Sequence, residues 1–109
     1  MLRPLLAALA VCSMMGMAHA SSCRASWYSE GRYTATGERF NPDGLTAAHR
    51  NLPLGALLRV TYGNRSVVVR LNDRGPAAWT GRCLDLSRGS ARALGILSAG
   101  VVTVHYEVM

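Results

Sequence analysis

The chain has 109 residues, with twelve arginines and no lysine against six acidic residues, and a formal net charge of +6. This length leaves room for one small domain and excludes a second of ordinary size. The charge indicates an anionic partner, but the arginines are scattered along the sequence, which argues against a nucleic-acid-binding surface.

Residues 1–20 have the pattern of a secretory signal peptide, with Arg3, an apolar stretch over residues 5–11 and a small-x-small sequence at residues 18–20. We expect cleavage after Ala20, which leaves a domain over residues 21–109 in the periplasm or cell envelope. Lipidation at Cys12 is the alternative, but Val11 is too bulky beside that cysteine. No segment reaches the roughly 20 apolar residues of a transmembrane helix, so we expect no membrane span.

Two cysteines remain beyond residue 20, Cys23 and Cys83, which are 60 residues apart. An even number of cysteines in a small exported domain predicts a disulfide. Closing a loop of this length stabilises a domain by about 4 kcal/mol in the chain-entropy model. The alternative is a pair of unpaired buried thiols.

Short runs of β-branched and aromatic residues between Gly, Asn, Asp and Pro predict strands throughout the domain. The Gly63-Asn64 pair predicts a tight hairpin. One short helix is predicted between Ser87, a suitable N-cap, and Gly95. A small closed barrel of the all-β class accounts for this pattern, because closure removes exposed sheet edges. The six predicted strands cover residues 24–28, 45–49, 57–62, 66–72, 82–86 and 101–108.

Three ionisable side chains lie at predicted strand ends or turns. Asp73 follows an apolar strand, Glu38 follows Gly37, and His49 ends the strand over residues 45–49. Each also has an ordinary structural explanation, as a turn cap, a solvated surface glutamate and a hydrogen-bonded histidine, respectively. Taken singly, none of the three establishes a catalytic site.

Other chemistries lack the residues that they need. His49 and His105 are the histidines beyond residue 20, and with the two cysteines so far apart no metal site of standard ligand spacing can be drawn. The sequence contains no Gly-rich phosphate loop and no Gly-x-Ser-x-Gly turn. We therefore expect no metal and no cofactor, and carboxylate chemistry remains.

Several motifs, taken in order, resemble the RlpA (rare lipoprotein A) family over nearly all of residues 24–108. The resemblance implies a six-stranded double-psi β-barrel with one or two short helices, as in expansins, and a periplasmic or envelope setting. It implies a lytic transglycosylase that cleaves between N-acetylmuramic acid and N-acetylglucosamine in strands poor in stem peptides, leaving 1,6-anhydromuramic ends. The motifs are Ala-Ser-Trp-Tyr at 25–28, Thr-Ala-Thr-Gly-Glu-Arg-Phe at 34–40, Leu-Thr-Ala-Ala-His at 45–49, Leu-Pro-Leu-Gly at 52–55, Val-Val-Val-Arg-Leu-Asn-Asp-Arg-Gly-Pro at 67–76 and Leu-Asp-Leu-Ser at 84–87.

The resemblance places Asp73, Glu38 and His49 in the active site. We expect Asp73 to be the acid/base, because attack by the muramic 6-hydroxyl needs no water nucleophile and one carboxyl can serve both steps. Glu38 would stabilise positive charge on the sugar or share the proton transfer, and His49 would orient a carboxylate or the substrate. Which carboxyl is the acid stays open here, since Arg74 would favour a charged Asp73 and burial a neutral one.

Five further residues are candidates for contact with the expected partner, the glycan strands of peptidoglycan. Trp27, Tyr28 and Trp79 have flat faces that suit sugar rings, although aromatic residues of small domains are more often core residues. Arg74 could bind a muramic carboxylate, and Asp85 could line the same groove, although capping the following helix explains it better.

Two other functions are compatible with the sequence. One is a non-catalytic, expansin-like module that binds and loosens wall polymer, and the other is an envelope domain that docks on a protein. The presence of both Asp73 and Glu38 favours the enzyme, because binding alone requires neither.

Overall fold

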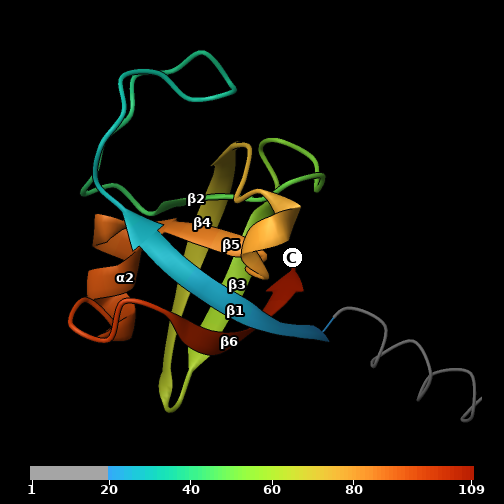
Figure 1. Ribbon diagram of the computed structural model, residues 1–109, viewed down its shortest axis with the longest axis vertical. Helices are drawn as coiled ribbons and strands as arrows, with labels where there is room; N and C mark the ends of the chain where they lie inside the picture. The colour runs from blue at the N-terminus through green and yellow to red at the C-terminus, as the bar shows by residue number, and fades with distance from the viewer. Residues whose placement is uncertain (1–19) are drawn as a thin grey trace, which may run out of the picture.

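The computed structural model describes residues 20–109, which form a closed six-stranded barrel (Figure 1). Around the barrel the strands follow the order β1-β5-β2-β4-β3-β6. Apart from Ala20, the predicted signal peptide lies outside the described residues. In the part that the structure describes, no helix is long and apolar enough to cross a membrane. The elements are β1 (Ala20–Tyr28), β2 (Thr46–Ala48), β3 (Leu57–Tyr62), β4 (Arg65–Asp73), the 3-10 turn η1 (Ala78–Thr80), β5 (Leu84–Ser87), helix α2 (Arg88–Leu94) and β6 (Val102–Val108).

The β3–β4 hairpin confirms the predicted turn, with Tyr62 paired to Arg65 across a two-residue loop. Gly63 has a φ of +60°, whereas Asn64 does not have a positive φ. This pattern, with only the first central residue in the left-handed region, is that of a type II′ turn and needs a glycine at that position.

The first strand is longer than predicted because it has two partners. Residues 20–25 pair with β6 in the antiparallel sense, and residues 25–28 pair with β5 in the parallel sense. The second strand is shorter than predicted, because only Thr46–Ala48 pair with β4 and β5. β1 therefore lies between β6 and β5, and its two pairings close the barrel.

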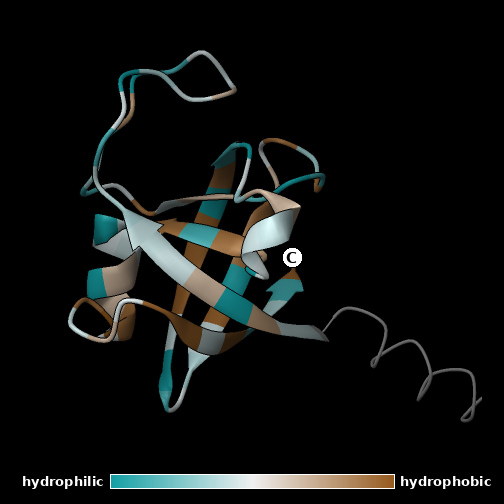
Figure 2. Ribbon diagram, in the orientation of Figure 1, coloured by the Kyte–Doolittle hydropathy of each residue, from teal (hydrophilic) through white to brown (hydrophobic). Residues whose placement is uncertain are grey.

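Alternating side chains fill the barrel. On β4, Val67, Val69 and Leu71 are buried in the core, and the residues between them face outward. The same alternation places Leu58 and Val60 of β3 inside. Figure 2 shows the resulting alternation of hydrophobic and hydrophilic bands along the strands. This period of two is the expected pattern for strands buried on one face.

Helix α2 has the predicted caps. The Ser87 hydroxyl accepts a hydrogen bond from the Ser90 N–H, and Gly95 has the left-handed conformation at the C-terminal end. Asp85 does not cap this helix, contrary to the explanation favoured from the sequence. Its side chain binds Ser26 of β1 and Arg82 instead.

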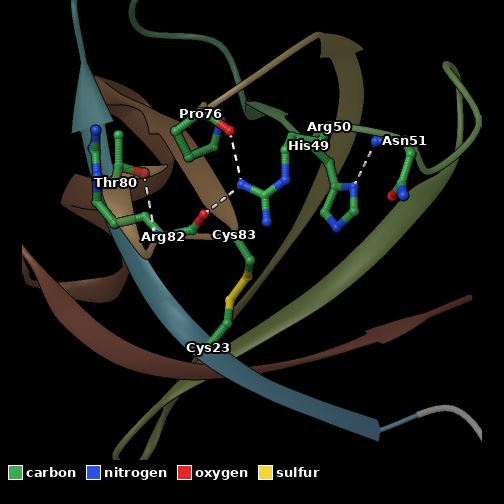
Figure 3. Close-up of a disulfide and its surroundings, with 8 residues drawn as sticks. All are labelled: Cys23, His49, Arg50, Asn51, Pro76, Thr80, Arg82 and Cys83. Carbon is green, nitrogen blue, oxygen red and sulfur yellow. Dashed lines mark hydrogen bonds between the residues drawn. A yellow bond between two sulfur atoms is a disulfide. The ribbon is translucent and has the colours of Figure 1, made fainter. Parts of the chain in front are cut away.

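The predicted disulfide is present between Cys23 of β1 and Cys83, with the two Cα atoms 5.9 Å apart (Figure 3). It joins β1 to the segment before β5. Arg50 fixes the same segment, because its guanidinium donates to the carbonyl groups of Pro76 and Arg82 at 2.8 and 2.7 Å. The chain between β4 and β5 is thus tied down at both ends.

Candidate functional site

Residues 31–40, here called the hairpin loop, lie in the segment between β1 and β2 that projects beyond the barrel (Figure 1). Tyr33 and Arg39 form an antiparallel bridge, and the Phe40 N–H donates to the Arg32 carbonyl at 2.8 Å. The Thr34 N–H donates to the backbone carbonyl of Glu38 at 2.9 Å. These bonds give the loop a defined backbone although it is too short to count as a pair of strands.

Asp73 lies at the end of β4, where the hairpin loop meets the barrel. Its Oδ1 accepts backbone N–H groups of Ala35 at 3.0 Å and Arg74 at 2.9 Å. Its Oδ2 accepts the Tyr28 hydroxyl at 3.2 Å. Since each carboxylate oxygen can accept about two hydrogen bonds, the Oδ2 has one position left for a substrate. The carboxylate is therefore held in a fixed orientation with one oxygen available.

The guanidinium of Arg74 turns away from Asp73. It donates to the backbone carbonyls of His49 at 3.4 Å and Leu52 at 2.5 Å, and so ties down the loop after β2. Among the described residues, Asp73 and Glu30 are the acidic side chains without an arginine side chain as partner. Arg74 thus does not form the ion pair with Asp73 that the sequence left open, and its guanidinium has a structural role.

Tyr28 connects Asp73 to the hairpin loop. Its ring stacks on that of Phe40, with the ring centres 4.6 Å apart and the planes inclined by 7°. Burial, and then the charge of Asp73, raise the pKa of the Tyr28 hydroxyl above its ordinary value. The hydroxyl therefore keeps its proton and remains a donor to Asp73. Because Phe40 covers one face of the ring, Tyr28 is better placed to orient the carboxylate than to stack on a sugar.

Glu38 is an anion fixed by a two-pronged ion pair. Arg70, which faces outward from β4, donates to both carboxylate oxygens at 2.7 and 2.9 Å. The Thr36 hydroxyl donates to the Oε1 at 2.9 Å. The hydrogen bonds from Arg70 and then Thr36 lower the pKa of Glu38 from 4.5 to about 2. At neutral pH this carboxylate is ionised and cannot act as the acid.

His49 lies directly after β2 and is buried. Its Nδ1 accepts the backbone N–H groups of Asn51 and Leu52 at 3.2 and 3.1 Å, as Figure 3 shows for Asn51. Its ring meets Tyr106 edge-on at 6.1 Å between centres. The link to Asp73 runs through the backbone, where the His49 N–H donates to the Asp73 carbonyl at 3.2 Å.

The imidazole of His49 is neutral at pH 7. Burial, followed by the positive charges of Arg50 and Arg74, lowers its pKa below the ordinary value. Because the Nδ1 accepts two hydrogen bonds, the proton is on the Nε2. Within residues 20–109 no hydrogen bond joins this ring to Asp73 or Glu38. Its expected role in orienting a carboxylate through the side chain stays a prediction.

Asp85 lies in one row with Asp73 on the barrel surface. In the strand pairing Ser26 is opposite Asp85, Asp85 is opposite Ala48, and Ala48 is opposite Asp73. Ala48 is almost fully buried, so a small residue separates the two carboxylates. Asp85 itself is engaged with the Ser26 hydroxyl and lies 3.4 Å from the Nη1 of Arg82.

The two tryptophans have different environments. Trp27 packs against the core, and its indole N–H donates to the Leu97 carbonyl at 3.2 Å. This arrangement favours the core interpretation over sugar stacking. Trp79, in η1, is 88% exposed, which leaves its ring free for a ligand.

The sequence did not identify Arg70, Ser26 or Arg82 as parts of the site. Arg70 alternates with the buried residues of β4, and this alternation is the signal that could have placed it outside. Its partner Glu38 is 32 positions away, and no local pattern predicts that pairing. Ser26 meets Asp85 only because β1 and β5 are neighbours in the barrel, whereas Arg82 lies three residues before Asp85 in the same segment.

Comparison with protein families gives one match over most of the chain. A family described as "Lytic transglycolase", of the double-psi β-barrel type, matches residues 20–106. The "Probable endolytic peptidoglycan transglycosylase RlpA" of Nostoc sp. is 59% identical over 81 residues, covering 72% of this chain and 22% of that protein. The "Endolytic peptidoglycan transglycosylase RlpA" of Campylobacter jejuni is 43% identical over 90 residues, covering 78% and 32%.

The matched segment spans less than a third of the length of these curated relatives. Among solved structures, the Streptomyces papain inhibitor has a TM-score of 0.71 at 20% identity, over 84% of this chain and 96% of that one, and it shares the fold. The Clavibacter michiganensis expansin has a TM-score of 0.69 at 25% identity, over 83% of this chain and 50% of that one. A mutant of that expansin is known in complex with cellohexaose, with a TM-score of 0.67 at 25% identity over the same fractions.

Proposed function

The chain belongs to the RlpA family of double-psi β-barrel proteins, and from this membership we propose that it is an endolytic peptidoglycan transglycosylase. Its substrate is the glycan strand of peptidoglycan, cleaved after N-acetylmuramic acid, in regions poor in stem peptides. The product carries a 1,6-anhydromuramic end. The relatives with the same activity in their names support the reaction class, and the described residues support the assignment of roles.

The observation that carries the proposal is the contrast between Asp73 and the other acidic groups near it. Glu38 and Asp85 are each paired with an arginine. Asp73 has three hydrogen-bond donors, no guanidinium and one oxygen left for a ligand. Glycosidases that use water need two working carboxyl groups, whereas an intramolecular attack needs one. A site with one available carboxyl therefore suits the lytic reaction.

The reaction has two proton transfers. Protonated Asp73 gives its proton to the glycosidic oxygen as the bond from that oxygen to the muramic C1 breaks, and N-acetylglucosamine leaves with a free 4-hydroxyl. The resulting carboxylate then accepts the proton of the muramic 6-hydroxyl as its oxygen bonds to C1. No water is consumed, and Asp73 returns to its protonated form. Such acid–base catalysis contributes about 10²–10⁴-fold to a rate.

The remaining groups bind and stabilise. Ionised Glu38 provides negative charge close to the developing oxocarbenium centre, and the Nε2–H group of neutral His49 donates a hydrogen bond to the substrate. Asp85, in the same row as Asp73, contacts a neighbouring sugar, and the exposed ring of Trp79 stacks on another. The protein acts in the periplasm or cell envelope after export by the signal sequence at residues 1–20.

The second candidate is an expansin-like module that binds and loosens the wall without cleaving it. The likeness to an expansin supports it, because a mutant of that protein, half of which matches this barrel, forms a complex with the unbranched glycan cellohexaose. This module would need the exposed aromatic and polar residues but not a proton donor.

Incubation of the purified protein with stripped glycan strands separates the two functions. The wild type should release fragments with anhydromuramic ends, detected by mass spectrometry. Asp73→Asn should lower the cleavage rate by at least about 100-fold while it still binds strands, because the amide keeps the shape but cannot transfer the proton. Binding without cleavage by the wild type would instead establish the loosening module.

A further inference from the structure

A cavity of about 390 Å³ lies beside the base of the hairpin loop. It is lined by Gly31, Arg32, Tyr33, Arg39 and Phe40. Tyr33 is 70% exposed, so its aromatic ring is largely open to solvent. None of these residues belongs to the catalytic set proposed above. The cavity is large enough for part of a ligand and has no assigned function.

The two arginines of this cavity have no side-chain partner in the described part of the chain. Within residues 20–109, neither Arg32 nor Arg39 forms an ion pair, and neither side chain donates a hydrogen bond. Glu30, although close in sequence, pairs with neither. Seven other arginines of the described chain are engaged with carboxylates or backbone carbonyls, namely Arg50, Arg59, Arg70, Arg74, Arg82, Arg88 and Arg92.

The backbone holds the two arginines on the two facing arms of the hairpin loop. The Tyr33–Arg39 bridge places Arg39 opposite Tyr33, and the Phe40 N–H bonds to the Arg32 carbonyl at 2.8 Å. Both side chains line this cavity, so a carboxylate bound in it would interact with two positive charges that have no partner among the described residues. Because the loop backbone is already bonded, little ordering is needed when the ligand binds. Guanidinium groups suit carboxylates because they can form two parallel hydrogen bonds.

The cavity is connected to the reacting carboxyl group. Phe40 lines it, the Phe40 ring stacks on Tyr28, and the Tyr28 hydroxyl binds Asp73. The same loop supplies the Ala35 N–H to Asp73. One pair of stacked rings thus lies between the cavity and the acid, so a glycan at Asp73 would have a neighbouring sugar within reach of the arginines.

We propose that this cavity is a binding subsite for a carboxylate carried by the glycan strand. Arg32 and Arg39 bind the carboxylate, and Tyr33 packs against the sugar that bears it. The proposal rests on the proposed function only in taking peptidoglycan as the ligand. A muramic acid residue has two sources of this group, which are its own lactyl carboxyl when no stem peptide is attached and the carboxyl groups of the stem peptide when one is.

Binding is measured in the Asp73→Asn background, so that the strands stay intact. The three ligands are stripped strands, stripped strands whose lactyl carboxyls are converted to methylamides, and strands that bear stem peptides. Arg32→Gln/Arg39→Gln is compared with the charge-matched control Arg59→Gln/Arg65→Gln. Arg59 lies on β3, and Arg65 directly follows the β3–β4 turn, which points away from the hairpin loop (Figure 1).

The Arg32/Arg39 pair variant should bind stripped strands on the order of tenfold more weakly than its parent, while the control keeps the parent's affinity. Methylamidation of the strands should weaken their binding to the parent to the same extent and should not change their binding to the pair variant. The comparison of the two ligands on the parent does not depend on how well the variant folds. If the pair variant instead binds peptide-bearing strands more weakly than its parent and binds stripped strands equally well, the stem peptide supplies the carboxylate.

Two results would overturn the subsite. One is that the Arg32/Arg39 pair variant binds all three ligands as tightly as its parent, and the other is failure of the parent to bind any of the three ligands. A wild-type protein that binds in a carboxylate-dependent way but never cleaves would retain the subsite and refute the proposed activity. The two proposals can therefore fail separately.

Discussion

At the scale of single residues, the carboxyl groups of the site differ in whether an arginine lies beside them. Arg70 holds Glu38 as an anion, and Arg82 lies beside Asp85, while Asp73 has only uncharged donors. A proton donor must exist in its protonated form for part of the time, and a guanidinium partner opposes this. The assignment of Asp73 as the acid therefore depends on where the guanidinium of Arg74 points.

Glu38 should make the stability of the protein depend on pH in a defined range. Its pKa falls from 4.5 to about 2 in the folded chain, so its contribution to stability is fully present above about pH 4.5 and is lost as the pH falls toward 2. Thermal unfolding followed at several pH values should show this loss in the wild type and a smaller loss in Glu38→Gln.

Glu107→Gln is the matched control, because it removes an exposed ion pair with Arg59 and leaves the Glu38–Arg70 pair in place. It should lose stability between pH 4.5 and 2 as the wild type does. The same pH dependence in Glu38→Gln and the wild type would show that the ion pair with Arg70 does not stabilise the loop.

The residues with chemical roles could be named from the sequence, but their contacts could not. The family motifs include Asp73, Glu38 and His49, and the roles expected for them remain predictions. The pairing of Glu38 with Arg70 joins positions 32 apart, and that of Ser26 with Asp85 joins positions 59 apart. Such contacts follow from the strand order, which composition and spacing do not determine.

At the scale of elements, the sequence predicted correctly those strands, turns and helix caps that depend on neighbouring residues. The strand over residues 57–62, the turn at Gly63 and the helix caps at Ser87 and Gly95 agree with the structure. The bridge within the hairpin loop was not predicted, since a single pair of residues is too short to give a periodic pattern. The extra length of β1 was missed because it depends on pairing with β6, which comes last in the chain.

Gly89 of helix α2 should be more sensitive to substitution than its helical position suggests. Alanine is normally preferred over glycine in helices by about 1 kcal/mol. At Gly89, however, a Cβ atom would lie 2.3 Å from the Asp43 carbonyl oxygen, in the segment that leads from the hairpin loop to β2. Gly89→Ala should therefore destabilise the protein by about 1–3 kcal/mol, measured by urea unfolding.

The exposed Ala93 gives a comparison within the same helix. Ala93→Gly should cost about 1 kcal/mol, which reflects helix propensity alone. Stabilisation by Gly89→Ala would contradict the close packing of α2 against the segment around Asp43.

At the scale of the whole molecule, the barrel brings distant segments to one face. The order β1-β5-β2-β4-β3-β6 puts the ends of β1, β2 and β4 near the hairpin loop, where Tyr28, His49 and Asp73 lie. The sequence predicted a closed barrel from strand number and turn signals, and the resemblance implied the double-psi type. The disulfide and Arg50 fix the segment between β4 and β5 on the same side.

The central claim is that Asp73 alone transfers the protons while the sugar's own hydroxyl attacks, and cleavage of stripped strands in ¹⁸O-labelled water tests it directly. Mass spectrometry should find anhydromuramic ends without the label in the wild-type products, and at least about 100-fold fewer of them with Asp73→Asn. Reducing ends that carry ¹⁸O would show that water is the nucleophile, and unlabelled anhydro ends formed at the wild-type rate by Asp73→Asn would show that another group is the acid.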